Sequence, residues 1–307
     1  MRLAVLSDTR LPTLPVGGHG LGRMAYDLAT GLHARGHSVA LYAGPNSLAP
    51  DGVTLATHTD ETTRAAEIAA NAPDDDVFVD LTHLHDLSLM APHLPQLHWL
   101  VDLECPHDPV NTIVGNKWQA SRAKSSRTVP LGIDVAAYPF VAKPDEYVLY
   151  AAKLHTYKGF DIAIDVAREA GAKLVMIGEN MAGAQLPPDV MYLGPIADNR
   201  TFQSYLCHAR ALLAPSRFDA GGRVLLEAAA CGTPSLVFDE TGCAGHVEHG
   251  VSGFVCRDGM EMVEALGDIA LIDRAGARAW VEREHSLDAM AAGVELYADA
   301  VLKGARW

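Results

Sequence analysis

The sequence of 307 residues is poor in cysteine and lacks any long apolar run. Its five cysteines are odd in number, and no two of them have C-x-x-C spacing. This argues against a disulfide framework or a cysteine zinc site and favours free thiols in a reducing cytoplasm. Because no apolar run approaches the roughly 18 residues of a transmembrane helix, none is expected. The N-terminus turns acidic too early for a signal peptide, so we expect a cytoplasmic protein, with peripheral membrane contact left open.

Basic residues are outnumbered, with 24 Lys and Arg against 38 Asp and Glu and a net charge of −14. This acid excess argues against nucleic acid as the main ligand, because phosphate backbones are bound by clustered Lys and Arg. The exception is a basic cluster formed by Lys117, Arg122, Lys124 and Arg127. The cluster is either a solvated helix face or a site for an anionic acceptor, a membrane surface or DNA. The neighbouring Trp118 could supply a stacking or interfacial ring.

Standard phosphate-binding loops are also missing. The glycine-rich loop with Gly17, Gly18, Gly20 and Gly22 matches neither G-x-G-x-x-G nor G-K-[ST]. Glycine nevertheless lets a ligand approach the backbone, and the helix that follows would direct its positive end toward that ligand. The alternative is a flexible loop that ends in a helix cap.

What the sequence does contain is a repeated alternation of short apolar strands and amphipathic helices. Residues 3–7, 21–32 and 38–43 predict a strand, a helix and a strand, an order typical of a right-handed parallel unit. Further strands are predicted at 77–81, 97–102, 112–115, 128–131, 147–151, 173–177, 191–193, 211–214 and 235–238. Further helices are predicted at 59–70, 117–124, 160–170, 201–208 and 224–231 and through most of 260–303.

This alternation predicts an α/β protein of two Rossmann-like, doubly wound domains. Two prolines and three charges make residues 138–146 the best linker candidate. We therefore expect domains at 1–137 and 145–285, with a final helix within 286–307 that packs back on the first domain. Ligands of such sheets bind outside the carboxyl ends of the strands, so the two halves are expected to face a common cleft.

Two lysines flank the loop after the predicted strand 147–151. They are Lys153 and Lys158, in the run A-K-L-H-T-Y-K-G. Two cations at a strand end can clamp a diphosphate and stabilise its charge as it leaves. The alternative is a pair of solvated surface lysines.

The most informative run is D-A-G-G-R-V-L-L-E-A-A-A-C-G-T-P, from Asp219 to Pro234. It places Asp219 eight residues before Glu227, with Gly221 and Gly222 before an apolar helix. A helix N-terminus favours an anion, and carboxylates accept hydrogen bonds from sugar hydroxyls. The run therefore predicts a site for a ligand with both hydroxyls and phosphate. Glu227 lies among apolar neighbours, where a buried carboxylate requires a partner.

Polar groups also follow strands of the first half. The run T-H-L-H-D contains His83, His85 and Asp86, and Asp102 ends the predicted strand 97–102. Histidine is the usual general acid or base near neutral pH. The H-x-H spacing also suggests a metal, but no third ligand motif accompanies it, which argues against a metal site.

Together these runs resemble the retaining glycosyltransferases of family 4 (glycosyl transferases group 1), in a compact form. The D-x7-E run resembles the E-x7-E signature of that family, and A-K-L-H-T-Y-K-G resembles its R-L-x-x-x-K-G. The segments L-G-I-D at 131–134 and G-V-S-G-F at 250–254 are similar to further family segments. Asp102 stands where family members often carry a histidine, and Gly245 where they often carry an acid.

The resemblance implies a GT-B fold and a hexose donor that is a UDP- or GDP-sugar held by the second domain. It implies transfer to an acceptor hydroxyl with retention of configuration, without a metal or a permanently bound cofactor. The donor-binding residues implied are Gly17, Gly18, Lys153, Lys158, Asp219, Gly221, Gly222, Arg223, Val224 and Glu227. The catalytic residues implied are Lys158, Lys153, Asp219 and Asp102, and the acceptor-side candidates are His83, His85 and Asp102.

Two other functions stay open. The departures at Asp219, Lys153 and Gly245 are compatible with a nucleotide-sugar-binding protein that has no transferase activity. The basic cluster is compatible with a glycosyltransferase that modifies nucleic acid.

Overall fold

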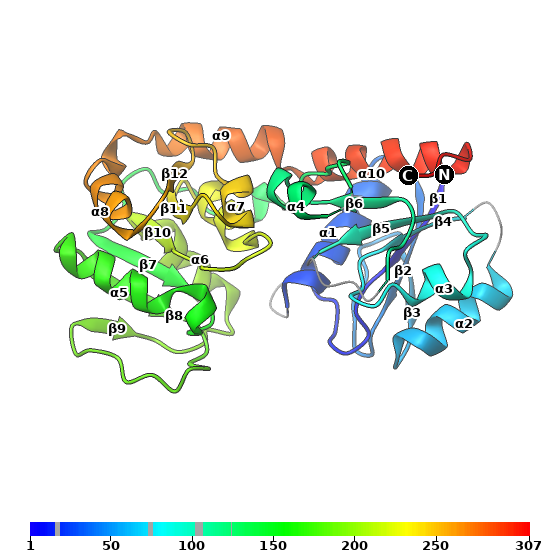
Figure 1. The fold of residues 1–307 in the computed structure, drawn as a ribbon, viewed down its shortest axis with the longest axis horizontal. Coiled ribbons are helices and arrows are strands. Elements are labelled where there is room, and N and C mark those ends of the chain that lie inside the picture. Colours follow the sequence, from blue (N-terminus) through cyan, green and yellow to red (C-terminus); the bar gives the residue numbers. More distant parts are fainter. Residues whose placement is uncertain (16–18, 73–75, 102–106, 124) are drawn as a thin grey trace. The chain divides into compact units, whose positions relative to one another are not determined.

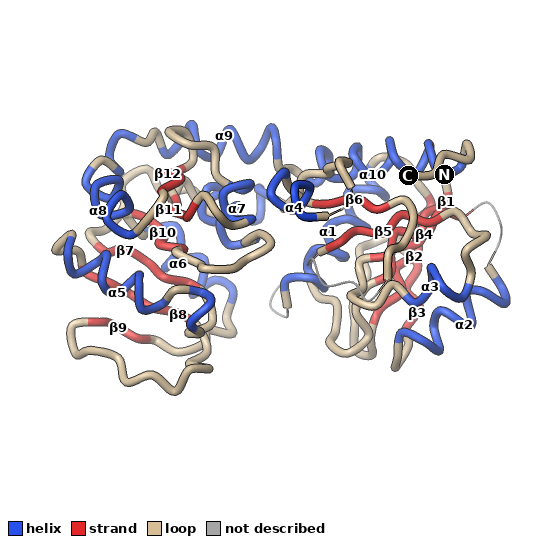
Figure 2. Tube along the Cα trace, viewed as in Figure 1, coloured by secondary structure: helices blue, strands red, loops and turns tan. Residues whose placement is uncertain are grey.

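The structure is a computed structural model that describes residues 1–307 except 16–18, 73–75, 102–106 and 124. It divides into two compact units (Figure 1). Unit 1 consists of Met1–Ile133 and His285–Trp307, and unit 2 consists of Asp134–Glu284. In each unit the strands gather into a sheet with helices around it (Figure 2).

Unit 1 is built on a six-stranded parallel sheet. In sheet order, its strands are β3 (Thr54–Thr57), β2 (Ser38–Ala43), β1 (Arg2–Leu6), β4 (Asp76–Asp80), β5 (Gln96–Leu100) and β6 (Thr112–Val114). Its helices are α1 (Gly20–Ala34), α2 (Glu61–Asn71), α3 (Asp86–Met90), α4 (Lys117–Arg122) and α10 (Leu287–Leu302). The central strands β1 and β4 are almost entirely buried, as expected for a parallel sheet covered on both faces.

Helix α10 belongs to the core of unit 1. It packs against α1 and contributes Met290 and Val294 to the same apolar cluster as the strands. The two helices meet closely, because a Cβ atom on Gly31 of α1 would collide with Leu287 and Ala291 of α10. The end of the chain therefore completes the core that its beginning starts.

Unit 2 is built on a second six-stranded parallel sheet. In sheet order, its strands are β12 (Gly253–Cys256), β11 (Ser235–Phe238), β10 (Ala211–Ala214), β7 (Tyr147–Ala151), β8 (Lys173–Ile177) and β9 (Val190–Tyr192). Its α-helices are α5 (Phe160–Glu169), α6 (Asn199–His208), α7 (Arg223–Ala230), α8 (Gly259–Gly267) and α9 (Arg274–Glu284). Its short 3-10 helices are η1 (Val135–Ala137), η2 (Thr156–Lys158), η3 (Gly242–His246) and η4 (Ile269–Leu271).

The two sheets have the same strand order. Counted along the chain within each unit, the third strand lies at one edge, followed by the second, first, fourth, fifth and sixth. This is the order of the dinucleotide-binding doubly wound fold. The predicted fold class, α/β with two Rossmann-like domains, is confirmed.

Most predicted strands coincide with observed ones, and five of them, at 38–43, 147–151, 173–177, 211–214 and 235–238, have the same bounds. The predicted strand at 128–131 is wrong, because only an isolated bridge joins Thr128 to Val114. Pro130 follows, and proline has no N–H group with which to continue a ladder. The short elements β3, β12 and α3 were not predicted.

Two further features follow the composition. None of the helices in the described parts of the chain combines the length and apolarity needed to cross a membrane. Four cysteines, Cys207, Cys231, Cys243 and Cys256, are buried free thiols. Cys105 lies outside the described residues.

Candidate functional site

A cavity of about 390 Å³ lies in unit 2, lined by residues of β7 and β10 and of the loops that follow them. These strands are where the sheet order reverses, which is the position at which doubly wound sheets bind ligands. Of the residues predicted to bind a donor, the cavity brings together Lys153, Lys158, Asp219, Gly221, Gly222, Arg223 and Val224. The fold thus joins the lysine loop to the D-A-G-G loop.

Tyr150 fixes the lysine loop. Its side chain is buried in β7, and its hydroxyl donates to the backbone carbonyls of Lys153 at 3.0 Å and Lys158 at 3.4 Å. Burial raises the pKa of Tyr150, so the hydroxyl stays protonated and keeps donating. Gly159 then turns the chain with a φ of 70°, where a Cβ atom would collide with the carbonyl oxygen of Pro215. The loop is therefore held at both ends.

Lys158 forms an ion pair with Asp219. Its Nζ atom lies 2.5 Å from Asp219 Oδ2, and the two side chains are 22% and 13% exposed. The other oxygen of Asp219, Oδ1, accepts a hydrogen bond from the Gly221 amide at 3.2 Å. Lys158 is therefore not a solvated surface lysine. Lys153, at the start of the same loop, is exposed.

The start of α7 completes the cavity wall. Gly222 precedes the helix, and among the described residues no side chain caps its first turn. The amides of that turn favour an anion. Gly242 of η3 supports the D-A-G-G loop from behind, because its amide donates to the Asp219 carbonyl at 2.7 Å and a Cβ atom on it would collide with Ala220.

Glu227 is buried in α7, with a relative exposure of 3%, and is not among the residues that line the cavity. Its Oε1 atom accepts hydrogen bonds from Arg223 Nε and from the Tyr138 hydroxyl, each at 3.0 Å. The expectation that this carboxylate needs a partner is confirmed. Its predicted contact with ribose stays a prediction. The i,i+4 spacing of Arg223 and Glu227 is a signal in the sequence for their pairing.

The predicted residues of unit 1 are described in part. Gly17, Gly18 and Asp102 lie outside the described residues. His83 is half-buried, whereas His85 is fully buried beside two residues that were not predicted, Asp80 and His98.

Asp80 and His98 both have shifted pKa values. Burial lowers the pKa of His98 to about 4, so this imidazole is neutral. Burial opposes ionisation of Asp80, but its contacts with His85 and Thr82 outweigh that effect and lower its pKa. The sequence argument against a metal, that H-x-H has no third ligand, does not hold in the folded chain, because neighbouring strands bring Asp80 and His98 to His85.

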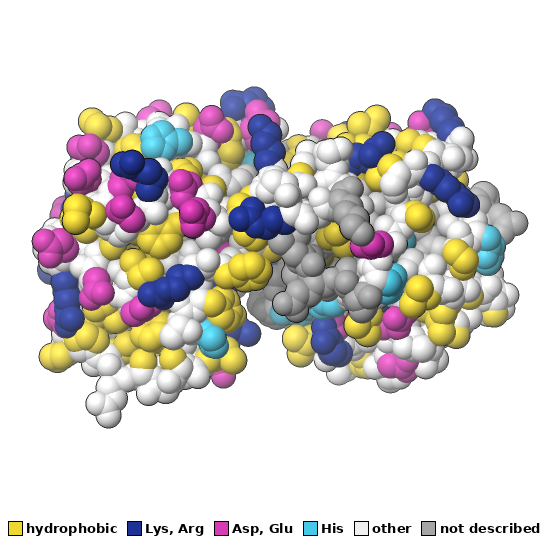
Figure 3. All heavy atoms as spheres, in the orientation of Figure 1, with side chains coloured by type: hydrophobic (Ala, Val, Ile, Leu, Met, Phe, Trp, Pro, Cys, Tyr) yellow, Lys and Arg dark blue, Asp and Glu magenta, His cyan; other side chains and the backbone are white. Residues whose placement is uncertain are grey.

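The basic cluster of unit 1 is partly engaged with aromatic rings. The Arg122 guanidinium lies 4.0 Å from the centroid of the Trp118 ring, and that of Arg127 lies 4.1 Å from the Trp307 ring. Lys117 is exposed, and Lys124 lies outside the described residues. Among the described residues on the face drawn in Figure 3, Lys and Arg are interspersed with Asp and Glu and form no continuous basic stripe.

Comparison with known proteins shows what unit 2 is similar to. Residues 138–284 match the family described as Glycosyl transferases group 1. A D-inositol 3-phosphate glycosyltransferase of Jonesia denitrificans is 30% identical over 167 residues, which cover 45% of this chain and 39% of that protein. The chain thus spans about two fifths of the length of the curated relative that it matches.

Solved structures resemble the whole chain. AviGT4, a glycosyltransferase involved in avilamycin A biosynthesis, is 21% identical with a TM-score of 0.77, covering 100% of this chain and 99% of that one. The Anabaena protein HepE, in complex with UDP and glucose, is 17% identical with a TM-score of 0.73, covering 98% of this chain and 100% of that one. Unit 2 is therefore similar to the Glycosyl transferases group 1 family, and the chain has the GT-B fold.

Proposed function

We propose that the protein is a retaining glycosyltransferase that moves a hexose from a UDP- or GDP-sugar to an acceptor hydroxyl. Unit 2 holds the donor and unit 1 contributes to acceptor binding. The observation that carries this proposal is the Lys158–Asp219 pair at the switch point of the unit 2 sheet, beside the open start of α7. The Lys158 cation and the first amides of α7 match the diphosphate of such a donor, and the Asp219 carboxylate matches the hydroxyls of its sugar.

Charge complementarity assigns the roles. Lys153, Lys158 and the first amides of α7 bind the diphosphate and stabilise its charge as it leaves. Asp219 accepts hydrogen bonds from the hydroxyls of the transferred sugar, and Glu227 supports the ribose end. These protein charges take the place of a divalent cation at the diphosphate.

The bond changes we propose are those of a front-face substitution, which the resemblance to retaining glycosyltransferases implies. The bond between the anomeric carbon and the β-phosphate oxygen breaks, and a bond to the acceptor oxygen forms on the same face of the sugar. The leaving phosphate takes the acceptor proton, so no protein nucleophile is needed. Two comparisons support a nucleotide-sugar donor in unit 2: the match of residues 138–284 to glycosyl transferases group 1, and the UDP and glucose bound by the structurally similar HepE.

The ion pair also predicts how the cavity responds to a donor. A diphosphate that takes Lys158 competes with Asp219 for the same Nζ atom, which now lies 2.5 Å from Asp219 Oδ2. Asp219 is then available to the sugar. A donor therefore exchanges one internal ion pair for two contacts of its own.

The first experiment is a thermal-shift screen of UDP- and GDP-sugars, since a bound donor stabilises the folded protein by mass action. Donors that bind are then tested for transfer and hydrolysis, with the anomeric configuration of the product read by NMR. Binding without turnover would favour a nucleotide-sugar-binding protein that has no transferase activity. Inversion of configuration would refute the retaining assignment.

The decisive variant is Lys158→Ala, which should lower turnover about tenfold or more. A matched control is Lys303→Ala at the C-cap of α10, which removes a lysine paired with Asp299 at 2.5 Å but exposed at 72%. This control should leave turnover unchanged. Wild-type turnover in Lys158→Ala would show that the pair in the cavity has no part in the reaction.

A further inference from the structure

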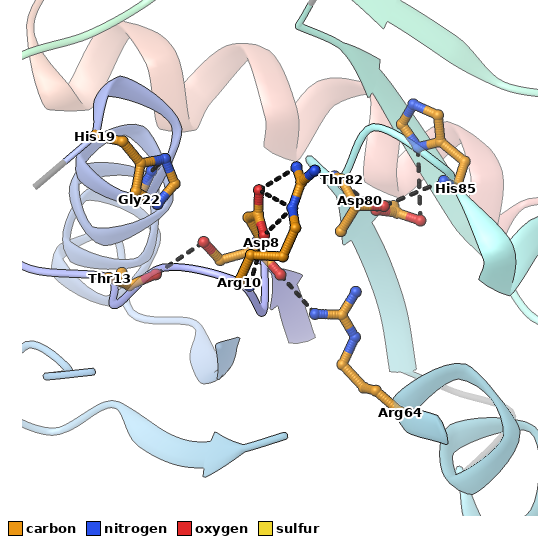
Figure 4. Close-up of polar contacts among 10 residues, drawn as sticks. Asp8, Arg10, Thr13, His19, Gly22, Arg64, Asp80, Thr82 and His85 are labelled. Carbon is orange, nitrogen blue, oxygen red and sulfur yellow. Dashed lines mark hydrogen bonds and ion pairs between the residues drawn. The ribbon is translucent and has the colours of Figure 1, made fainter. Parts of the chain in front are cut away.

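Three buried side chains of unit 1 converge on one point. Asp80 ends β4, His98 lies opposite it in the register of β5, and His85 immediately precedes α3. Their relative exposures are 1%, 0% and 2% respectively. Figure 4 shows the ring of His85 directed at the carboxylate of Asp80. Each residue thus offers one ligand atom to a shared point in the interior.

The spacing of these atoms is the main observation. The Nδ1 atom of His85 lies 3.5 Å from Asp80 Oδ2, that of His98 lies 3.8 Å from the same oxygen, and the two Nδ1 atoms lie 3.4 Å apart. These separations exceed the usual hydrogen-bond range of about 2.7–3.2 Å. A tetrahedral metal with bonds of about 2.0–2.2 Å holds its ligand atoms about 3.3–3.6 Å apart. The triangle is therefore close to one face of a metal tetrahedron.

Thr82 orients the carboxylate. Its amide and its hydroxyl donate to Asp80 Oδ1 at 2.9 and 2.6 Å, which leaves Oδ2 directed at the imidazoles. The Thr82 hydroxyl oxygen also lies 3.2 Å from the His85 amide and accepts its hydrogen bond. Outer hydrogen bonds of this kind fix the ligands of protein metal sites. One threonine thus positions two of the three ligand residues.

The backbone conformation of His85 is a further observation in favour of this site. This residue has a φ of 51° and a ψ of 38°, in the left-handed region. That conformation is unfavourable for a residue other than glycine, because its Cβ atom lies too close to the following carbonyl oxygen. It places the imidazole of His85 against Asp80 and His98, where it makes the contacts that offset the strain.

We propose that Asp80, His85 and His98 form a binding site for a divalent transition metal, with zinc the ion that fits this donor set best. Two imidazoles and one carboxylate in tetrahedral spacing are typical of zinc. A cavity of about 350 Å³ adjoins the site through His98, which lines it together with His107. The bound metal links β4, β5 and the start of α3, so its role is to stabilise unit 1. It lies in another unit from the cavity assigned to the donor diphosphate.

The test uses the whole 307-residue chain, free of any histidine tag and treated with a chelator. We expect one equivalent of Zn²⁺ to bind and to raise the midpoint of thermal unfolding. Co²⁺ in its place should give the intense visible absorption bands of a tetrahedral site. Failure to bind one equivalent of either ion would overturn the proposal in favour of a metal-free hydrogen-bonded network.

Variants assign the ligands. His98→Ala should weaken Co²⁺ binding by more than the 10–100-fold that is typical of losing an outer-shell partner. His83→Ala is the matched control, because it removes the other histidine of the H-x-H run, which is not part of the converging set, and it should keep wild-type affinity. If His98→Ala does not fold, Asp80→Asn provides a second test, because asparagine has nearly the same shape as aspartate. Asp80→Asn should also lose the Co²⁺ spectrum. Wild-type affinity in Asp80→Asn would refute the site.

Discussion

Glu227 offers a direct test of how unit 2 is held together. Its pair with Arg223 is an i,i+4 contact at 3.0 Å in which the side chains are 4% and 11% exposed. The Tyr138 hydroxyl donates to the same carboxylate oxygen at 3.0 Å. Glu227→Ala therefore removes a charge partner of Arg223, which is largely buried, and a hydrogen-bond acceptor of the Tyr138 hydroxyl.

The expected loss is large for a single side chain. Removing one member of a buried ion pair lowers the free energy of unfolding by about 3–5 kcal/mol, because the remaining charge is left uncompensated. The slight exposure of Arg223 places the expectation at the lower end of that range. Glu227→Gln keeps an oxygen that can accept from Tyr138 and Arg223, so its loss should be about 1–2 kcal/mol.

The assay is urea unfolding followed by tryptophan fluorescence, measured on a protein in which Trp99, Trp118 and Trp307 of unit 1 are replaced by Phe, so that Trp280 of unit 2 gives the signal. The matched control is Glu282→Ala, which breaks another i,i+4 pair with an arginine, that of Arg278 at 2.9 Å, in which the glutamate is 51% exposed. This control should lose about 0.2–0.5 kcal/mol. Equal losses for the two alanine variants would refute the argument that burial makes the Glu227 pair important.

The stability effect and the binding effect of Glu227 must be separated. Calorimetry on folded Glu227→Gln should show UDP binding weakened by about 1–3 kcal/mol if the carboxylate supports the ribose. Unchanged affinity would leave Glu227 a purely structural residue. The buried pair would then explain by itself why this helix contains a glutamate.

Three further changes should have measurable effects. Glu61 is buried, and neither of its carboxylate oxygens has a hydrogen-bond partner among the described residues. Burial raises its pKa above the ordinary value of 4.5, so stability should fall as pH rises from that value through the raised pKa. Glu61→Gln should therefore flatten the pH profile of urea unfolding and stabilise the protein at neutral pH, and an unchanged profile would contradict this reasoning. Gly242→Ala should displace the Asp219 loop and weaken donor binding about tenfold or more in a thermal-shift titration, whereas Gly267→Ala, with open space at its Cβ position, should not. Arg274 donates to three backbone carbonyls and a threonine hydroxyl, so Arg274→Ala should lower the free energy of unfolding by about 3 kcal/mol or more, and a loss under about 0.5 kcal/mol would count against that network.

Strands were the part of the fold that sequence pattern predicted best, because a short apolar run between turn signals is itself the physical cause of a buried parallel strand. The pattern failed where another force decided. Pro130 ends pairing after a single bridge at Thr128. Strand β3 is mostly exposed at the sheet edge, so its T-L-A-T run gives no apolar signal. Helix α3 is five residues long and follows a left-handed histidine, which no helical periodicity reveals.

The candidate site divides in the same way. Lysine and D-A-G-G loops could be assigned to one cavity from sequence, because the carboxyl ends of adjacent parallel strands share an edge. The contacts between individual side chains could not be predicted, because they join positions that are far apart in the sequence. Lys158 meets Asp219 across 61 residues and Tyr138 meets Glu227 across 89. The register of β4 against β5, which sets Asp80 opposite His98, is likewise a property of the sheet.

The two units share a strand order but differ in the chemistry at the switch point. In unit 2, the ends of β7 and β10 lead to Lys158 and Asp219 at an open cavity. In unit 1, the end of β4 leads to Asp80, which is buried and directed at two imidazoles. Function is therefore set by the side chains at the strand ends rather than by the topology. It follows that the two proposed sites act separately: a chelator should lower the stability of unit 1 without changing nucleotide affinity in unit 2, and Lys158→Ala should change turnover without changing Co²⁺ binding.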